Sequence, residues 1–186
     1  MATRATAKLN DTSPSTTVTS LGSSFKRSLL AQNKSDQTVA TYMEAVHLLG
    51  QFLALRGMPA EVGALRREHI ESFISDLLDR FKPATANNRY RGLQQFFKWL
   101  LEEGEVKSSP MINMKPPLVP EEPPAVLTSD QLRRLLRACE GRTFDDRRDA
   151  AIVMLLLDTG IRRGECAGLK VDDLDLDGNV AVVLGK

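Results

Sequence analysis

Several residue types that define common protein classes are scarce in this sequence. The 186 residues include two cysteines and two histidines, and Cys139 and Cys166 cannot build a disulfide framework or a cysteine-based zinc site. His47 and His69 offer no histidine-rich metal site. No apolar run reaches the roughly 20 residues that a membrane-spanning helix needs. We therefore expect a protein of the reducing cytoplasm with no metal site and no membrane partner.

An excess of charge of one sign is missing as well. Lysine and arginine total 25 and aspartate and glutamate total 24, which gives a net charge of +1. This balance neither indicates nor excludes a nucleic-acid partner. The hydrophobic content of 42% and the charged content of 26% are ordinary for a globular protein. The length suits one domain, or a small domain followed by part of another.

Apolar periodicity divides the first part of the chain into a tail and a helical domain. Residues 1–22 are rich in serine and threonine and poor in large apolar residues, which predicts a disordered tail. Residues 23–107 predict four helices, the first of them capped by Ser23 or Ser24. The other three helices are expected near residues 35–56, 67–78 and 83–103.

The fourth expected helix carries a basic, amide-rich face. Between Arg80 and Lys98 there are five basic residues and no acidic residue. Lysine and arginine attract DNA phosphates, while asparagine and glutamine can also meet base edges. A solvated surface without a ligand is the alternative interpretation. The residues that share this face are Asn87, Asn88, Arg91, Gln95 and Lys98.

A proline-rich segment separates the helical domain from the rest of the chain. Residues 108–125 contain six prolines, which predicts a semi-rigid linker. Residues 126–186 follow as a second domain, in which Thr128 caps a helix. The stretch 151–157 is apolar on nearly all sides, so it predicts a helix that is buried almost all round.

A tight glycine turn after this apolar stretch presents two arginines. The sequence DTG at 158–160 interrupts the run, and Gly160 can adopt the positive φ that is common at helix ends. Arg162 and Arg163 then begin another helix together with Glu165. Arginine grips a phosphate with two parallel hydrogen bonds. An exposed ion pair between Arg162 and Glu165 is the alternative.

The last segment allows either a hairpin or a calcium loop. The opening of an EF-hand loop is matched by Asp173, Asp175, Asp177 and Gly178. Position twelve of such a loop requires a bidentate glutamate, but Leu184 stands there. The β-branched residues Val180, Val182 and Val183 favour a strand.

The arginine turn and the last strand belong to a longer pattern. Residues 159–174 read T-G-I-R-x-G-E and then G-L-x-x-x-D-L, and a β-branched strand and Lys186 follow. This pattern resembles the first catalytic-arginine box of the tyrosine recombinases, the phage integrase family. The resemblance implies that Arg162 is catalytic, that Glu165 supports it, and that Lys186 is the catalytic lysine.

The helical domain resembles the N-terminal core-binding domain of the same family. The likeness lies in T-V-x-x-Y at 38–42 and N-N-R-Y-R-x-L-x-x-F-F-x-W-L at 87–100. In the family, the second and fourth helices of this domain face DNA. With Lys98 added from the basic face, the implied DNA-contact residues are Thr38, Thr41, Asn87, Asn88, Arg91 and Lys98.

The resemblance also implies a fold and a function. The implied fold is mainly α, with a four-helix SAM-like DNA-binding domain joined by the Pro-rich linker to an incomplete α+β catalytic domain that ends in a β-hairpin. The implied function is DNA integration and recombination without a cofactor, with double-stranded DNA as partner and self-association on it. The family's His-x-x-Arg box and nucleophilic tyrosine have no counterpart in this sequence, so we expect no strand cleavage by this chain alone. The alternative is a non-catalytic DNA-binding module that competes for recombination sites.

Overall fold

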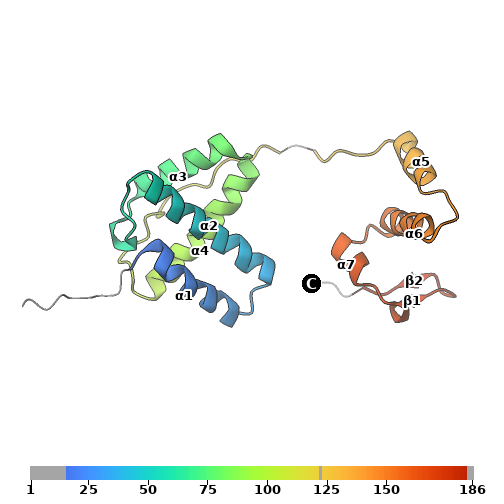
Figure 1. Ribbon diagram of the computed structural model, residues 1–186, viewed down its shortest axis with the longest axis horizontal. Coiled ribbons are helices and arrows are strands. Elements are labelled where there is room, and N and C mark those ends of the chain that lie inside the picture. Colours follow the sequence, from blue (N-terminus) through green and yellow to red (C-terminus); the bar gives the residue numbers. More distant parts are fainter. Residues whose placement is uncertain (1–15, 122, 184–186) are drawn as a thin grey trace, which may run out of the picture. The chain divides into compact units, whose positions relative to one another are not determined.

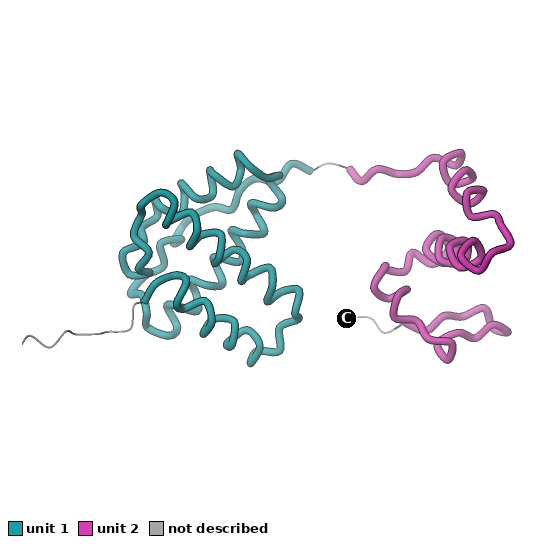
Figure 2. The backbone as a smooth tube through the Cα atoms, in the orientation of Figure 1, with its two compact units in different colours: residues 1–121 teal, residues 122–186 magenta. Residues whose placement is uncertain are grey.

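The chain forms two compact units in a computed structural model that describes residues 16–121 and 123–183. Unit 1 comprises Met1–Glu121 and unit 2 comprises Glu122–Lys186 (Figure 2). Among the described residues, no helix combines the length and the apolar character needed to cross a membrane. The fold is mainly helical with one small antiparallel sheet, which confirms the predicted fold class.

Unit 1 is built from the helices α1 to α4 (Figure 1). They are α1 (Val18–Ala31), α2 (Asp36–Leu55), α3 (Arg67–Arg80) and α4 (Pro83–Glu102), with a short 3₁₀ turn at Val62–Ala64. The Ser35 hydroxyl accepts a hydrogen bond from the Thr38 N–H and caps α2. Pro83 begins α4, where its missing N–H costs nothing. α2 packs against both α1 and α4 and is the centre of the unit.

The core of unit 1 is aromatic and lies between these helices. Phe25 of α1 meets Phe96 of α4 edge to face, with ring centroids 5.2 Å apart, and Trp99 lies against both rings. Phe96, Phe97 and Trp99 are all buried. α2 and α4 approach each other so closely at Gly92 that an added Cβ there would lie 3.0 Å from the Ala45 Cβ.

The first helix begins earlier than the sequence predicts. Thr17 caps α1 in place of Ser23 or Ser24, and its hydroxyl accepts from the Ser20 N–H at 3.1 Å. The prediction of a disordered tail over residues 1–22 is therefore wrong for residues 16–22. Backbone pairing orders this segment, since the Val18 N–H donates to the Ala60 carbonyl at 3.0 Å. Residues 1–15 of that prediction lie outside the described residues.

The predicted linker is also shorter than its composition indicates. Met111 is buried in the core of unit 1, and unit 1 extends to Glu121. The prediction of a linker over residues 108–125 is wrong for its first part, because that part packs on the helices. Proline content reports local stiffness, whereas the buried methionine depends on a tertiary contact that composition does not encode.

Unit 2 holds three helices and a hairpin in its described part. They are α5 (Ser129–Ala138), α6 (Phe144–Thr159), α7 (Arg163–Gly168), a 3₁₀ turn at Val171–Asp173, and the strands β1 (Leu174–Asp175) and β2 (Val180–Ala181). The strands pair antiparallel, with Leu174 opposite Ala181 and Asp175 opposite Val180. Thr128 caps α5, as the sequence predicts.

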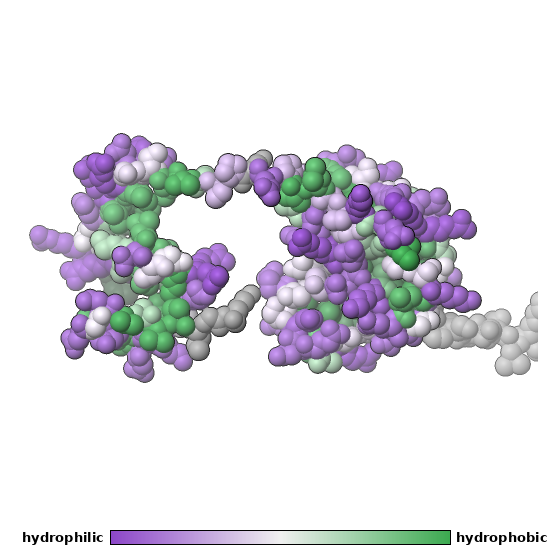
Figure 3. Space-filling view, turned by 180° about the vertical axis from the view of Figure 1, so that it is seen from behind, coloured by the Kyte–Doolittle hydropathy of each residue, from purple (hydrophilic) through white to green (hydrophobic). Residues whose placement is uncertain are grey.

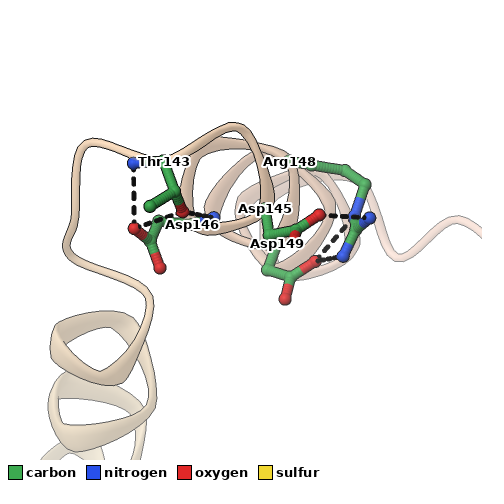
Figure 4. Close-up of polar contacts among 5 residues, drawn as sticks. All are labelled: Thr143, Asp145, Asp146, Arg148 and Asp149. Carbon is green, nitrogen blue, oxygen red and sulfur yellow. Dashed lines mark hydrogen bonds and ion pairs between the residues drawn. The ribbon is translucent and has the colours of Figure 1, made fainter.

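Polar contacts define the beginning of α6 (Figure 4). The Thr143 hydroxyl accepts from the Asp146 N–H at 3.1 Å, and the Asp146 carboxylate accepts from the Thr143 N–H at 3.0 Å. The Thr143 hydroxyl also donates to the Asp146 Oδ2 at 2.6 Å, and this hydrogen bond, followed by the one from the Thr143 N–H, lowers the pKa of Asp146. One turn later, the Arg148 guanidinium pairs with Asp145 and Asp149, each at 2.8 Å.

The prediction that residues 151–157 are buried almost all round is wrong. No described residue of α6 is fully buried, and Ile152, Met154 and Leu157 are exposed. Among the described elements, α6 packs mainly against α5 and α7, and two short helices cannot cover a helix on every side. Figure 3 shows apolar side chains on the surface of unit 2.

Candidate nucleic-acid interface

The arginine turn of unit 2 is set by a left-handed glycine. Gly160 has φ +64° and ends α6, and its N–H donates to the Leu156 carbonyl at 3.1 Å. The Ile161 N–H then donates to the Thr159 hydroxyl at 3.2 Å. The turn brings Arg162 directly to the start of α7, where it is the N-cap residue.

Glu165 braces Arg162 through two hydrogen bonds. The Arg162 backbone N–H donates to the Glu165 Oε2 at 3.0 Å, and the Arg162 Nη1 donates to Oε1 at 2.9 Å. The backbone hydrogen bond and then the guanidinium hydrogen bond lower the pKa of the Glu165 carboxyl. The ion pair that the sequence offered as the alternative therefore exists, and it holds the guanidinium beside Glu165.

The guanidinium nevertheless remains open to solvent. The Arg162 side chain is 83% exposed, whereas the Glu165 side chain is 17% exposed. Within the described part of the chain, the guanidinium hydrogen-bonds only to Glu165. An arginine oriented from one side in this way can donate its other N–H groups to a phosphate.

The hairpin after α7 uses its aspartates to form a turn. The Asp175 carboxylate accepts from the N–H groups of Asp177 and Gly178, at 3.1 and 2.8 Å. Asn179 has φ +53° and completes the turn into β2. Among the described residues, no three histidine, cysteine, aspartate or glutamate side chains gather to hold a metal ion. Lys186, the predicted catalytic lysine, lies outside the described residues.

In unit 1, the threonine candidates of α2 are engaged locally. The hydroxyls of Ser35 and Thr38 share a hydrogen bond of 2.9 Å. The Thr41 hydroxyl donates to the Gln37 carbonyl at 2.7 Å. Both threonines are half-buried, so each presents only part of its side chain to a ligand.

The α4 candidates divide into exposed and internal residues. Asn88, Arg91 and Lys98 are exposed, and Lys98 lies 3.8 Å from the Glu102 carboxylate. A shallow groove beside α4 is lined by Asn88, Arg91 and residues 116–119. Asn87 is 9% exposed, and its amide donates to the Pro117 carbonyl at 2.8 Å. The structure thus gives Asn87 an internal hydrogen bond in place of a surface position.

Sequence reasoning missed Arg89, a residue of α4 that contacts α2. Its Nη2 lies 2.7 Å from the Glu44 Oε1, and its Nη1 donates to the Thr41 carbonyl at 3.5 Å. The side chain is 14% exposed. In the sequence, Arg89 is one of several basic residues on α4. The pattern alone does not distinguish an arginine that is paired with another helix from one that is exposed.

Family models match the two units separately and in order. The phage integrase N-terminal SAM-like domain matches residues 21–104, and the phage integrase family matches residues 125–186. The first match covers most of α1 and all of α2, α3 and α4. The second covers the described elements of unit 2, including the arginine turn.

Several curated relatives are tyrosine recombinases. A XerD from Lacticaseibacillus casei is 32% identical over 117 residues, covering 63% of this chain and 40% of the relative. A XerC from Neisseria meningitidis serogroup C is 30% identical over 167 residues, covering 87% of this chain and 55% of the relative. The chain thus spans about half the length of the curated relatives that it matches.

Solved structures with a similar fold are also integrases. A lambda integrase tetramer bound to a Holliday junction has a TM-score of 0.71 and 19% identity, covering 90% of this chain and 50% of that one. The Tn1549 transposon integrase, in complex with circular intermediate DNA, has a TM-score of 0.69 and 23% identity, covering 91% of this chain and 54% of that one. At these identities the likeness shows the fold. The two matching family models, together with the XerC and XerD relatives, show that the chain belongs to the phage integrase family of tyrosine recombinases.

Proposed function

We propose that the chain binds duplex DNA in site-specific recombination. The observation that carries the proposal is Arg162, whose exposed guanidinium is oriented by the low-pKa Glu165 at a glycine turn. Such a group stabilises negative charge that develops on a phosphoryl oxygen, because it is already positioned before the charge appears. In this proposal Arg162 meets the scissile phosphate, and Glu165 holds it there. Lys186 is proposed as the general acid that protonates the departing oxygen.

The proposed DNA surface of unit 1 is the exposed face of α4 with the start of α2. Asn88, Arg91 and Lys98 lie exposed along α4, and their charges and amides suit the phosphate backbone and groove edges. Thr38 and Thr41 contribute the partly exposed hydroxyls of α2. We leave Asn87 out of this surface, because its amide is buried against the Pro117 carbonyl.

Neither tyrosine of this chain suits the role of nucleophile. Tyr90 is 1% exposed, and its hydroxyl donates to the Met114 carbonyl at 2.6 Å. Burial raises the pKa of Tyr90, which further disfavours the phenolate. Tyr42 lies in α2, packed against the core of unit 1. We therefore propose that this chain binds DNA and positions a phosphate, and that it forms no covalent adduct through its own tyrosines.

The DNA surface on α4 is tested by the salt dependence of binding. Arg91→Ala and Lys98→Ala should each weaken binding to a fluorescently labelled duplex and lower the slope of log affinity against log salt by about one. Arg27→Ala removes an exposed cation from α1 and serves as the matched control. Fluorescence anisotropy at several salt concentrations gives these slopes. If Arg91→Ala and Lys98→Ala keep the wild-type slope of log affinity against log salt, as the control should, then α4 does not contact the DNA.

A further inference from the structure

The chain after α4 folds back onto unit 1. Gly104, with φ +76°, follows the end of α4, and Val106 and Met111 are buried in the core. A tight turn follows, in which the Ile112 N–H donates to the Ser109 carbonyl at 3.2 Å. Asn113 has φ +58°, a conformation that asparagine adopts more readily than most residues.

Two side chains of α4 hold the returning segment. The Tyr90 hydroxyl donates to the Met114 carbonyl at 2.6 Å, and the Asn87 amide donates to the Pro117 carbonyl at 2.8 Å. Asn87 lies about one helical turn before Tyr90, while Pro117 follows Met114 in the chain. The segment therefore runs antiparallel to α4. Both donors are nearly buried, so water competes little with these hydrogen bonds.

We propose that Asn87 and Tyr90 are positioning residues that clamp residues 112–117 onto α4. With this clamp the connection to unit 2 begins after Pro117, and without it the connection begins after Met111, which the core still buries. At roughly 3.5 Å per extended residue, the stretch from Pro117 to Thr128 spans at most about 40 Å, and the stretch from Met111 about 60 Å. The clamp thus sets how far α5 and the arginine turn can lie from unit 1.

The consequence for binding rests on the proposed function. When two linked units bind one duplex, the second unit binds at an effective concentration that falls roughly as the −3/2 power of linker length. Lengthening the free stretch by about half therefore weakens binding about twofold, with no contact to DNA removed. Asn87 and Tyr90 act on DNA affinity through the linker in this scheme.

The existence of the clamp is tested without DNA, on the full chain. The double variant Asn87→Ala/Tyr90→Phe removes both donors while the ring of residue 90 stays in the core. Hydrogen exchange at the amides of Ile112 and Met114 should accelerate about tenfold, because two modest hydrogen bonds are lost. Exchange in α1 should stay unchanged, as should exchange throughout the control Gln51→Ala. If the amides of Ile112 and Met114 exchange at the wild-type rate in the double variant, the proposed clamp does not exist.

The role of the clamp is tested by duplex affinity in two backgrounds. The double variant should bind about twofold more weakly than the wild-type chain, and this loss should vanish when Arg162→Ala is also present. A loss that persists with Arg162→Ala would mean that Asn87 or Tyr90 acts on DNA directly, which overturns the positioning role. If Arg162→Ala alone leaves affinity unchanged, the proposed function fails, whereas the exchange measurement still decides whether the clamp exists.

Discussion

Glu165 performs two tasks with one carboxylate. The first N–H groups of a helix lack acceptors within it, and the Glu165 carboxylate accepts from the Arg162 N–H at the start of α7. The same carboxylate orients the guanidinium that we propose for the phosphate. The motif spacing of three residues is therefore explained by helix geometry, which brings residues i and i+3 together.

The lowered pKa of Glu165 gives a prediction at this scale. The pKa of Glu165 in the folded chain lies below the ordinary value of 4.5. The stabilising contact between the Glu165 carboxylate and Arg162 is therefore present above pH 4.5 and is lost as the pH falls through the folded pKa. An NMR titration of the side-chain carboxyl carbon should place the midpoint of Glu165 below 4.5. Arg162→Ala should raise the midpoint only in part, since the backbone N–H that contributes most remains. A midpoint at or above 4.5 in the wild-type chain would contradict this account.

Among the elements, α2 and α4 make the contact that positions the proposed DNA surface. They cross closely because Gly92 has no side chain at the point where α4 meets Ala45 and the Tyr42 backbone. Arg89 adds the ion pair with Glu44 beside this crossing. The exposed residues of both helices therefore keep a fixed spacing.

Gly92→Leu should disrupt this crossing. A leucine there overpacks the contact with Ala45, and we expect the free energy of unfolding to fall by about 1–3 kcal/mol despite leucine's better helix propensity. Gly63→Leu is the matched control, because a Cβ at that position meets nothing within 4 Å. Urea unfolding followed by Trp99 fluorescence reports on unit 1, since the chain has one tryptophan. Equal stability of the two variants would show that the crossing tolerates a side chain.

At the scale of the whole chain, prediction from sequence succeeded where local signals agreed. α2 and α4 combine an apolar stripe with a cap at Ser35 or a proline at Pro83, so periodicity and termini indicate the same helix. The start of α1 and the packing of Met111 depend on contacts with distant segments. Exposure of Ile152 in α6 likewise depends on which elements cover it, and an apolar run does not report that.

The candidate site was predictable in part for the same reason. Arg162 and Glu165 lie on one short helix start, where spacing in sequence fixes spacing in space. Asn87 was predicted as a surface residue because its helical face looks polar, but the returning segment covers it. Arg89 was not recognised, because its partner Glu44 comes from another helix.

The most direct test of the central claim compares two neighbouring arginines on one duplex. Arg162 and Arg163 are both exposed at the start of α7, and we propose that only Arg162 meets the phosphate. Duplex affinity of the full chain, measured by fluorescence anisotropy at low salt, should fall about tenfold more in Arg162→Ala than in Arg163→Ala, because a charge-assisted hydrogen bond to phosphate is lost. Equal affinities of the two variants would contradict the assignment of Arg162 to the phosphate.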